Sequence, residues 1–168
     1  MTLLPNSSSS SQSSCNDFDF FIGTWTVQHR RLNERLVDCA EWSTFAGSTS
    51  VQKILGGLGN VDDNGLALPG GEYRAATIRS FNPKTNLWAI WWLDARNPHY
   101  LDVPVVGQFC NDVGLFYADD VLNGLPIKVR FMWTLPAPDQ PRWEQAFSLD
   151  AGVTWETNWV MEFTRANT

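Results

Sequence analysis

Long apolar runs are absent from this chain of 168 residues. A membrane-spanning helix needs about 20 consecutive, mainly apolar residues, and no such stretch occurs. The segment from Met1 to Ser14 is rich in serine and has neither a basic start nor an apolar core, so we expect no secretory signal there. We therefore expect a cytoplasmic protein with no membrane partner, made of a disordered tail at 1–16 and one folded domain at 17–168.

Cysteine and clustered basic residues are also scarce. The three cysteines (Cys15, Cys39 and Cys110) have neither metal-ligand spacing nor the number that a disulfide framework needs, so we expect reduced thiols. With only two histidines and scattered carboxylates, the sequence predicts no metal site. The net charge is −6 and no basic cluster is present, which argues against nucleic acid or an anionic membrane as a partner.

Helical periodicity is missing as well, whereas short segments of period two recur along the chain. Short loops and even spacing predict an all-β fold, a single antiparallel up-and-down barrel of about ten strands. Gly47 is expected to end one strand, and the glycine-rich segment 56–71 is expected to be a long loop, either a lid or a plain flexible connection. The expected strands are 24–31, 37–46, 49–55, 73–81, 87–94, 105–110, 114–119, 119–122, 126–134, 142–148 and 154–165.

The first and last of these strands are expected to pair and close the barrel, which removes both sheet edges. Before the first strand, the short apolar segment 17–22 predicts a turn of helix that plugs one end, with Asp17 as its cap. In the last strand, residues alternate between two faces. One face carries Trp155, Thr157, Trp159, Met161, Phe163 and Arg165, and the other carries Glu156, Asn158 and Glu162.

The turn before the last strand has a motif of its own. Residues 148–155 read Ser-Leu-Asp-Ala-Gly-Val-Thr-Trp, which resembles the Asp-box of sialidase propellers, Ser-x-Asp-x-Gly-x-Thr-Trp. The resemblance implies a structural role, in which Ser148 and Asp150 bind the turn backbone and Trp155 packs beneath it. A propeller needs several copies at a regular period, and one copy is present. The motif therefore indicates a well-made hairpin turn and not a glycosidase.

Gly23-Thr24-Trp25 in the first strand and Arg165 in the last resemble the calycin superfamily of lipocalins, fatty-acid-binding proteins and nitrobindin-like barrels. The pattern is closer still to bacterial lipocalin-like domains of unknown function. In lipocalins such an arginine packs over the tryptophan and closes the barrel bottom. Nitrobindin-like barrels bind haem through a histidine, but His99 is not at that family's ligand position, so we expect no haem and no other cofactor.

Polar side chains on the inward face of the predicted strands are the candidate site residues, because burial of a polar group is costly without a partner. His29 and Arg31 share the Trp25 face, and Glu41 is a candidate for the same side. His29 and Glu41 are a candidate catalytic acid–base pair, against the alternative of a solvated or backbone-bonded histidine. The candidate ligand-binding residues are His29, Arg79, Trp91, Arg130, Trp133, Gln145 and Trp159. Arg79 and Arg130 either hold a ligand carboxylate, as in fatty-acid-binding barrels, or face outward or form ion pairs.

Three functions are compatible with such a barrel, since a fold does not fix a function. The first is a protein that binds a small, mainly hydrophobic or aromatic molecule in the barrel cavity. The second is an enzyme of the cyclase or isomerase type that uses the cavity for acid–base chemistry. The third is a barrel filled by its own side chains that serves as an interaction or homodimerisation module.

Overall fold

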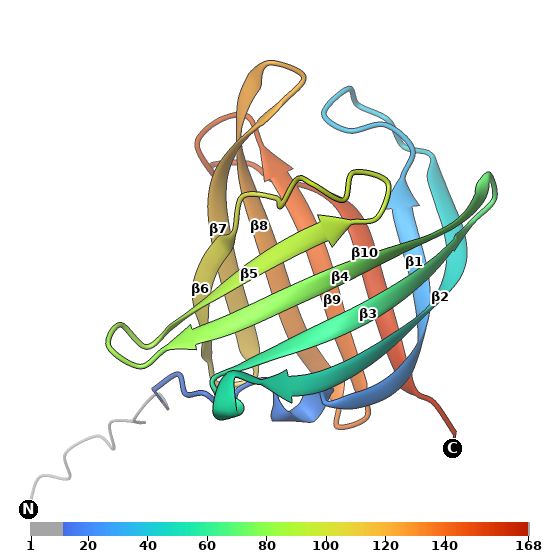
Figure 1. Cartoon of the computed structure of the whole chain (residues 1–168). Coiled ribbons are helices and arrows are strands. Elements are labelled where there is room, and N and C mark those ends of the chain that lie inside the picture. The colour runs from blue at the N-terminus through green and yellow to red at the C-terminus, as the bar shows by residue number, and fades with distance from the viewer. Residues whose placement is uncertain (1–11, 168) are drawn as a thin grey trace, which may run out of the picture.

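The structure is a computed structural model that describes residues 12–167. Ten antiparallel strands form one closed barrel, in which each strand pairs with its neighbours in the chain and β1 pairs with β10 (Figure 1). The predicted all-β, antiparallel up-and-down barrel is confirmed. The strands are β1 (Gly23–Leu32), β2 (Trp42–Ile54), β3 (Gly59–Leu68), β4 (Gly71–Asn82), β5 (Leu87–Asp94), β6 (Val105–Cys110), β7 (Val113–Leu122), β8 (Leu125–Ala137), β9 (Gln140–Ser148) and β10 (Glu156–Arg165).

The predicted elements between residues 37 and 71 are wrong in two places. β2 runs unbroken through Gly47, where glycine permits a close approach: a Cβ atom there would lie 2.4 Å from Nε2 of His29. The segment predicted as a long loop is mostly strand β3, which follows the short 3₁₀ turn η2 (Leu55–Gly57). β3 pairs along its whole length with β4, and its residues 59–66 pair with β2, so this segment is part of the barrel wall and not a lid.

A short plug closes one end of the barrel, as the sequence predicted. The 3₁₀ turn η1 (Asp19–Phe21) lies beneath the strands (Figure 1), and Phe18 and Phe21 insert into the core with only 1% of each residue exposed. The Asp17 carboxylate accepts hydrogen bonds from the backbone N–H of Ser14 (3.0 Å) and from the indole of Trp88 on β5 (3.2 Å). The plug is therefore tied to the barrel wall.

The boundary predicted at residue 16 falls inside this ordered turn. Ser13 is buried and its hydroxyl also donates to the Asp17 carboxylate. Residues 1–11 of the predicted tail lie outside the described residues.

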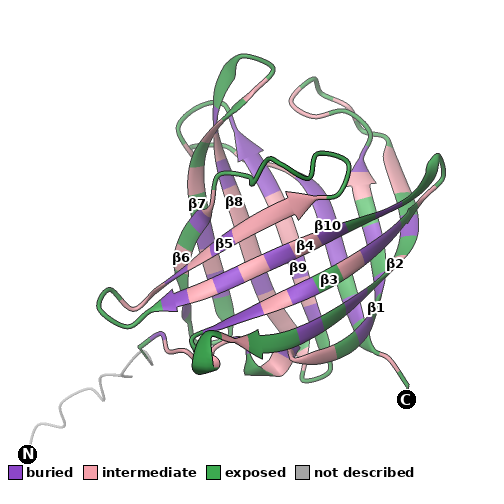
Figure 2. Ribbon diagram, in the orientation of Figure 1, coloured by how far each residue is buried: buried purple, intermediate pink, exposed green. Residues whose placement is uncertain are grey.

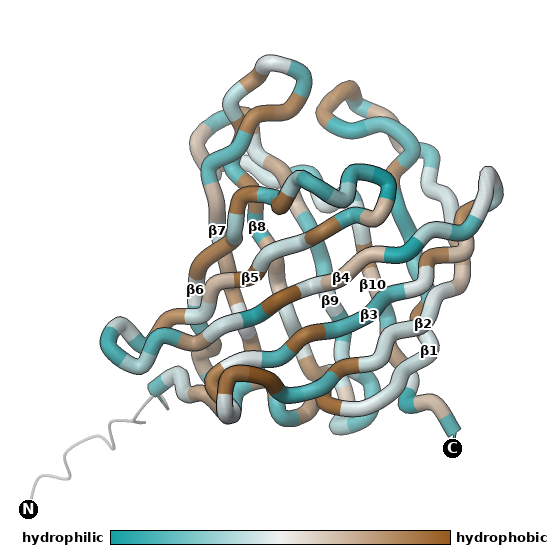
Figure 3. Tube along the Cα trace, viewed as in Figure 1, coloured by the Kyte–Doolittle hydropathy of each residue, from teal (hydrophilic) through white to brown (hydrophobic). Residues whose placement is uncertain are grey.

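Burial alternates along the strands, as expected for a wall with one apolar face. Figure 2 shows buried and more exposed positions following each other along β3, β4 and the strands behind them. At the end of the barrel opposite the plug, the loop that follows β5 is largely hydrophilic (Figure 3). The interior is thus sealed by aromatic rings at one end and bordered by polar loops at the other.

Candidate ligand cavity

A cavity of about 240 Å³ lies within the barrel, between the plug and the polar loops of the opposite end. An engineered cavity of about 150 Å³ accepts benzene, so the space inside this barrel is large enough for a fused two-ring body. Apolar side chains form most of its wall: Phe21, Ile90, Trp92, Val103, Val105, Val129, Phe131, Trp133, Trp143, Phe147, Trp159, Met161 and Phe163.

Three tryptophans from different strands form one side of the cavity. The ring of Trp159 on β10 lies 5.5 Å from that of Trp143 and 5.8 Å from that of Trp92, at interplanar angles of 85° and 78°. Edge-to-face contacts of this kind are favourable and hold the rings in fixed orientations. The result is a rigid aromatic surface of the kind on which a flat ligand stacks.

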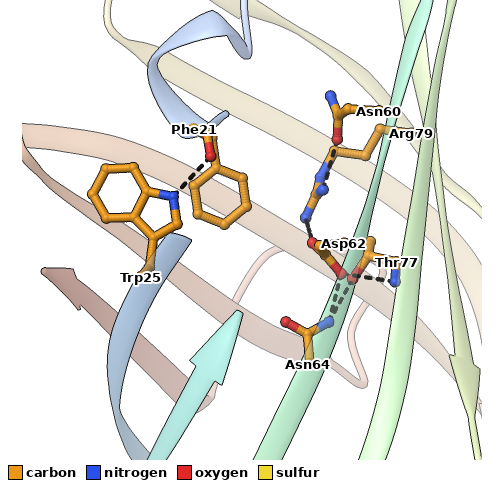
Figure 4. A network of polar contacts seen from close by, with 7 residues as sticks. All are labelled: Phe21, Trp25, Asn60, Asp62, Asn64, Thr77 and Arg79. Atoms are coloured by element: carbon orange, nitrogen blue, oxygen red, sulfur yellow. Dashed lines mark hydrogen bonds and ion pairs between the residues drawn. The ribbon is translucent and has the colours of Figure 1, made fainter. Parts of the chain in front are cut away.

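A buried polar cluster faces the cavity from β3 and β4. Arg79 donates from Nη2 to Oδ2 of Asp62 (2.7 Å) and from Nη1 to Oδ1 of Asn60 (2.8 Å) (Figure 4). Asp62 also accepts from the backbone N–H of Thr77 (2.8 Å) and from the Asn64 side chain. The pairing of Asp62 with Thr77 across the β3–β4 ladder brings these groups together. The two charges thus neutralise each other inside the barrel.

The Arg79 guanidinium is enclosed by aromatic rings. Its Cζ lies 5.3 Å from the Phe18 ring, 5.2 Å from the Phe21 ring and 5.5 Å from the Trp133 ring. Such cation–π contacts favour a desolvated guanidinium. Among the described residues, Nε of Arg79 and Nε1 of Trp133 are buried donors without a hydrogen-bond partner. Both residues line the cavity, but these two nitrogen atoms are themselves buried behind its surface.

Four polar side chains gather at the open end on the side of β1. Arg31 lies over the Trp159 ring (5.1 Å) and Arg35 over the Phe147 ring (5.7 Å). Arg96 lies 3.7 Å above the Tyr73 ring and forms an ion pair with Asp94 (2.6 Å). All of these residues contribute to the cavity lining.

Burial and charge shift the pKa values of two groups at this end. Burial, and then the positive charge of Arg31, lowers the pKa of Arg35 to about 10. Burial also raises the pKa of the Tyr73 hydroxyl, although Arg31 and Arg96 act in the opposite direction. The shift of Arg35 shows that two like charges lie close together where water is partly excluded.

The structure does not bring the predicted acid–base pair together. His29 is buried and opposes Phe45 in the β1–β2 ladder, with the two rings stacked at 4.6 Å. Glu41 is exposed, precedes β2, and accepts the backbone N–H of Asn33 at its carbonyl. Nδ1 of His29 instead accepts a hydrogen bond from the Trp159 indole (3.2 Å), and His29 is not among the residues that line the cavity. Burial, and then the charge of Arg31, lowers the pKa of His29 to about 4, so the ring is neutral at pH 7.

The other predicted ligand-binding residues divide between the two faces of the wall. Arg79, Trp133, Gln145 and Trp159 line the cavity. Trp91 lies between the cavity-lining residues Ile90 and Trp92, and strand alternation therefore turns it outward. Arg130, between Val129 and Phe131, likewise faces outward and lies over the Trp155 ring (4.6 Å).

Four of the cavity residues were absent from the predicted ligand-binding positions. Arg35 fell in an expected turn and Asp62 in the expected long loop, although Asp62 and Arg79 are cross-strand neighbours of the kind that pair charges. The sequence did predict that Arg31 faces inward, because Trp25, His29 and Arg31 share one face of a strand with period two. The prediction named Trp91 as a ligand-binding residue, whereas the neighbouring Trp92 lines the cavity.

The residues expected to shape the barrel make the contacts that the resemblance implies. The Arg165 guanidinium lies 3.9 Å above the Trp25 ring and donates to the carbonyl oxygens of Ile22 (2.7 Å) and Phe20 (3.2 Å). Gly23 has a φ of 122°, and a Cβ atom at this position would lie 2.5 Å from Nη1 of Arg165. Glycine is therefore required both by the backbone conformation and by the space that the arginine occupies.

The Asp-box turn also has the expected bonds. The Asp150 carboxylate accepts from Ser148 Oγ (2.7 Å), from Thr154 Oγ1 (2.6 Å) and from the Thr154 backbone N–H (2.8 Å). These bonds lower the pKa of Asp150 to about 2. The Trp155 indole donates to the carbonyl of Gly152 (3.0 Å), which fixes the ring against the turn.

Within 12–167, no three His, Cys, Asp or Glu side chains are grouped so that they could hold a metal ion. In the same part of the chain, no helix has the length and apolar character required to cross a membrane.

The sequence matches no family model and no curated protein. Among solved structures, the S-type phycobiliprotein lyase CPES from Guillardia theta is similar, with a TM-score of 0.60 and 8% sequence identity. The similarity covers 90% of this chain and 91% of that chain. At this identity the similarity concerns the fold, and together with the closed ten-stranded barrel it shows that the chain has the lipocalin-like fold.

Proposed function

We propose that this protein binds a small, mainly hydrophobic organic molecule with a flat aromatic body in the barrel cavity. The observation that carries the proposal is the cavity of about 240 Å³ with its wall of fixed aromatic rings, Trp92, Trp143 and Trp159. Ligand sites are mostly apolar and concave, with a few polar groups that fix orientation. The lining residues Thr77 and Gln145 carry polar groups of that kind.

No observation favours the enzyme alternative over binding. Its two predicted groups are separated, because His29 packs in the wall and Glu41 lies at the surface before β2. A barrel filled by its own side chains is also disfavoured, since the interior keeps an open volume beside eight aromatic side chains: Phe21, Trp92, Phe131, Trp133, Trp143, Phe147, Trp159 and Phe163.

The proposal is tested by filling the cavity. Val129 lines it from β8, whereas the neighbouring Lys128 faces outward and pairs with Asp119. Val129→Phe is expected to weaken binding of a neutral two-ring probe, 2-naphthamide, by about tenfold or more, because an overfilled site accommodates a ligand only with strain. Lys128→Phe, the matched control, is expected to leave the affinity unchanged. Isothermal titration calorimetry measures both, and thermal unfolding checks that each variant is folded.

Equal affinity of the two variants would contradict the proposal, because a ligand in the cavity must respond to a phenyl ring at position 129.

A further inference from the structure

Four arginines line the cavity, and they differ in their partners. Arg79 is paired with Asp62, and Arg96 is paired with Asp94. Within the described residues, Arg31 and Arg35 have no carboxylate within 4 Å. Glu156 attracts Arg35 and Asp94 attracts Arg31 only from beyond ion-pair distance, so two like charges lie at the edge of an apolar cavity without a close partner.

Glu156, the acidic side chain that acts on the charge of Arg35, is already engaged. Glu156 accepts the backbone N–H of Leu36 at Oε1 (2.8 Å), which holds the carboxylate at the start of β10. Nε of Arg35 is buried without a hydrogen-bond partner among residues 12–167. Burying a guanidinium without an acceptor is costly, and an anion that pairs with its other N–H groups lowers the cost of placing the charge there.

Aromatic rings hold both guanidinium groups in place. Arg31 is over Trp159, and Arg35 is over Phe147. Trp159 belongs to the aromatic surface of Trp92, Trp143 and Trp159, called the tryptophan wall below. Stacking on a ring fixes the plane of the guanidinium while its N–H groups stay directed sideways, as bidentate recognition of an oxyanion requires. Because Arg31 touches Trp159, an anion bound by Arg31 lies beside the aromatic surface.

We propose that Arg31 and Arg35 together bind an anionic oxygen group of the ligand, a carboxylate or a phosphate, at the open end of the cavity. This inference rests on the proposed function and specifies the chemical class of the ligand as a flat aromatic acid. The aromatic body stacks against the tryptophan wall, and the acidic group lies on the β1 side.

The opposite side of the open end has the opposite charge. Asp102, in the loop before β6, and Asp120 on β7 also line the cavity. Partial desolvation and the neighbouring carboxylates of Asp120 and Asp94 raise the pKa of Asp102, so these acidic groups lie near one another. This arrangement repels an anion from the β7 side and orients an acidic ligand toward Arg31 and Arg35.

Three probes with the same ring system test the proposal on the full chain. They are 2-naphthoate, 2-naphthamide and 2-naphthyl phosphate, which present a carboxylate, a neutral amide and a phosphate. Hydrogen bonds to charged groups are stronger than neutral ones, so we expect the wild-type protein to bind 2-naphthoate or 2-naphthyl phosphate about tenfold or more tightly than 2-naphthamide. Whichever anion binds more tightly identifies the class of acid.

Single substitutions then locate the anion. Arg31→Gln and Arg35→Gln are each expected to weaken binding of the preferred anion by about tenfold and to weaken 2-naphthamide much less, so that the preference for the anion is lost. Arg30→Gln is the matched control, because Arg30 is the adjacent residue of β1, is exposed and lies over Trp42 on the outer face. It is expected to change neither affinity.

Two outcomes overturn the proposal in different ways. If all three probes bind the wild-type protein with equal affinity, the anion site is wrong and the apolar cavity remains the binding site. If none of the probes binds, the anion site and the proposed function both fail. The comparison within the wild-type protein requires no variant, so a variant that fails to fold does not prevent the test.

Discussion

The Arg79 guanidinium and the Asp62 carboxylate form an ion pair at 2.7 Å in which the two side chains are only 4% and 2% exposed. Removing one partner of a buried pair leaves an uncompensated charge in a medium of low polarity. We expect Asp62→Asn to lower the free energy of unfolding by about 3–5 kcal/mol, measured by urea denaturation.

The adjacent residue of β3 provides the control for this prediction. Asp63 pairs with Arg74 at the surface, where the side chains are 69% and 51% exposed. Because solvent screens such a pair, we expect Asp63→Asn to cost less than about 1 kcal/mol. Equal losses for the two variants would show that the pair inside the barrel is not desolvated.

Because the pKa of His29 is lowered in the folded protein, we expect the stability to depend on pH. Its pKa is about 4 in the folded protein and 6.5 in the reference state, so the unfolded chain binds more protons between these values. Stability therefore rises with pH from about 4 to about 6.5 and is fully present above that, with a contribution of about 3 kcal/mol. We expect His29→Asn, whose Oδ1 can still accept from Trp159, to remove this part of the pH dependence. Denaturation midpoints of both proteins at pH 4.5 and pH 7 check this, and an unchanged slope in the variant would contradict it.

The contacts of Arg165 with Trp25 and with two carbonyl groups are expected to stabilise the folded barrel. Lysine keeps the charge but cannot both cover the ring and donate to two carbonyl groups, as the guanidinium does. We expect Arg165→Lys to reduce stability by about 1–2 kcal/mol. Arg74→Lys, which conserves a surface ion pair, is expected to have little effect on the unfolding midpoint.

The Asp-box turn predicts a second pH effect, at lower pH. Hydrogen bonds from Thr154 and Ser148 hold the pKa of Asp150 at about 2, below its ordinary value of 3.8. The stabilisation is therefore present above pH 3.8 and is lost as the pH falls toward 2. We expect Asp150→Asn to lower the melting temperature at pH 7, and the difference from the wild type to shrink below pH 3.8. A difference that stays constant down to pH 2 would exclude a role for the charged form.

The barrel could be predicted from the sequence because period-two alternation and turn residues are local signals. Asn123 and Gly124 both have positive φ, at 50° and 80°, as the two-residue hairpin between β7 and β8 requires. Gly23, Trp25 and Arg165 could be assigned by resemblance because they meet at the closing β1–β10 seam. Glycine was the misleading residue: Gly47 and Gly59 lie within strands, where the backbone or a side chain approaches closely.

The inward face of individual strands was harder to predict, because a single irregularity reverses the alternation. The ladder of β10 with β9 shifts between Thr157 and Trp159. As a result Asn158, predicted outside, is fully buried and accepts from Gln145 (2.8 Å), while Trp155 packs outside against Arg130. The buried pair of Asp62 with Arg79 could not be predicted, because the glycine-rich composition of segment 56–71 indicated a loop and therefore gave no strand register.

The most direct test of ligand binding in the cavity follows the indole N–H signals of the nine tryptophans by NMR during titration with 2-naphthamide. Trp92, Trp143 and Trp159 line the cavity, whereas Trp91 and Trp155 lie outside it. We predict that the signals of the first three shift in a saturable manner and that those of Trp91 and Trp155 stay in place. Saturable shifts of the outer two with no change in the cavity signals would contradict binding inside the barrel.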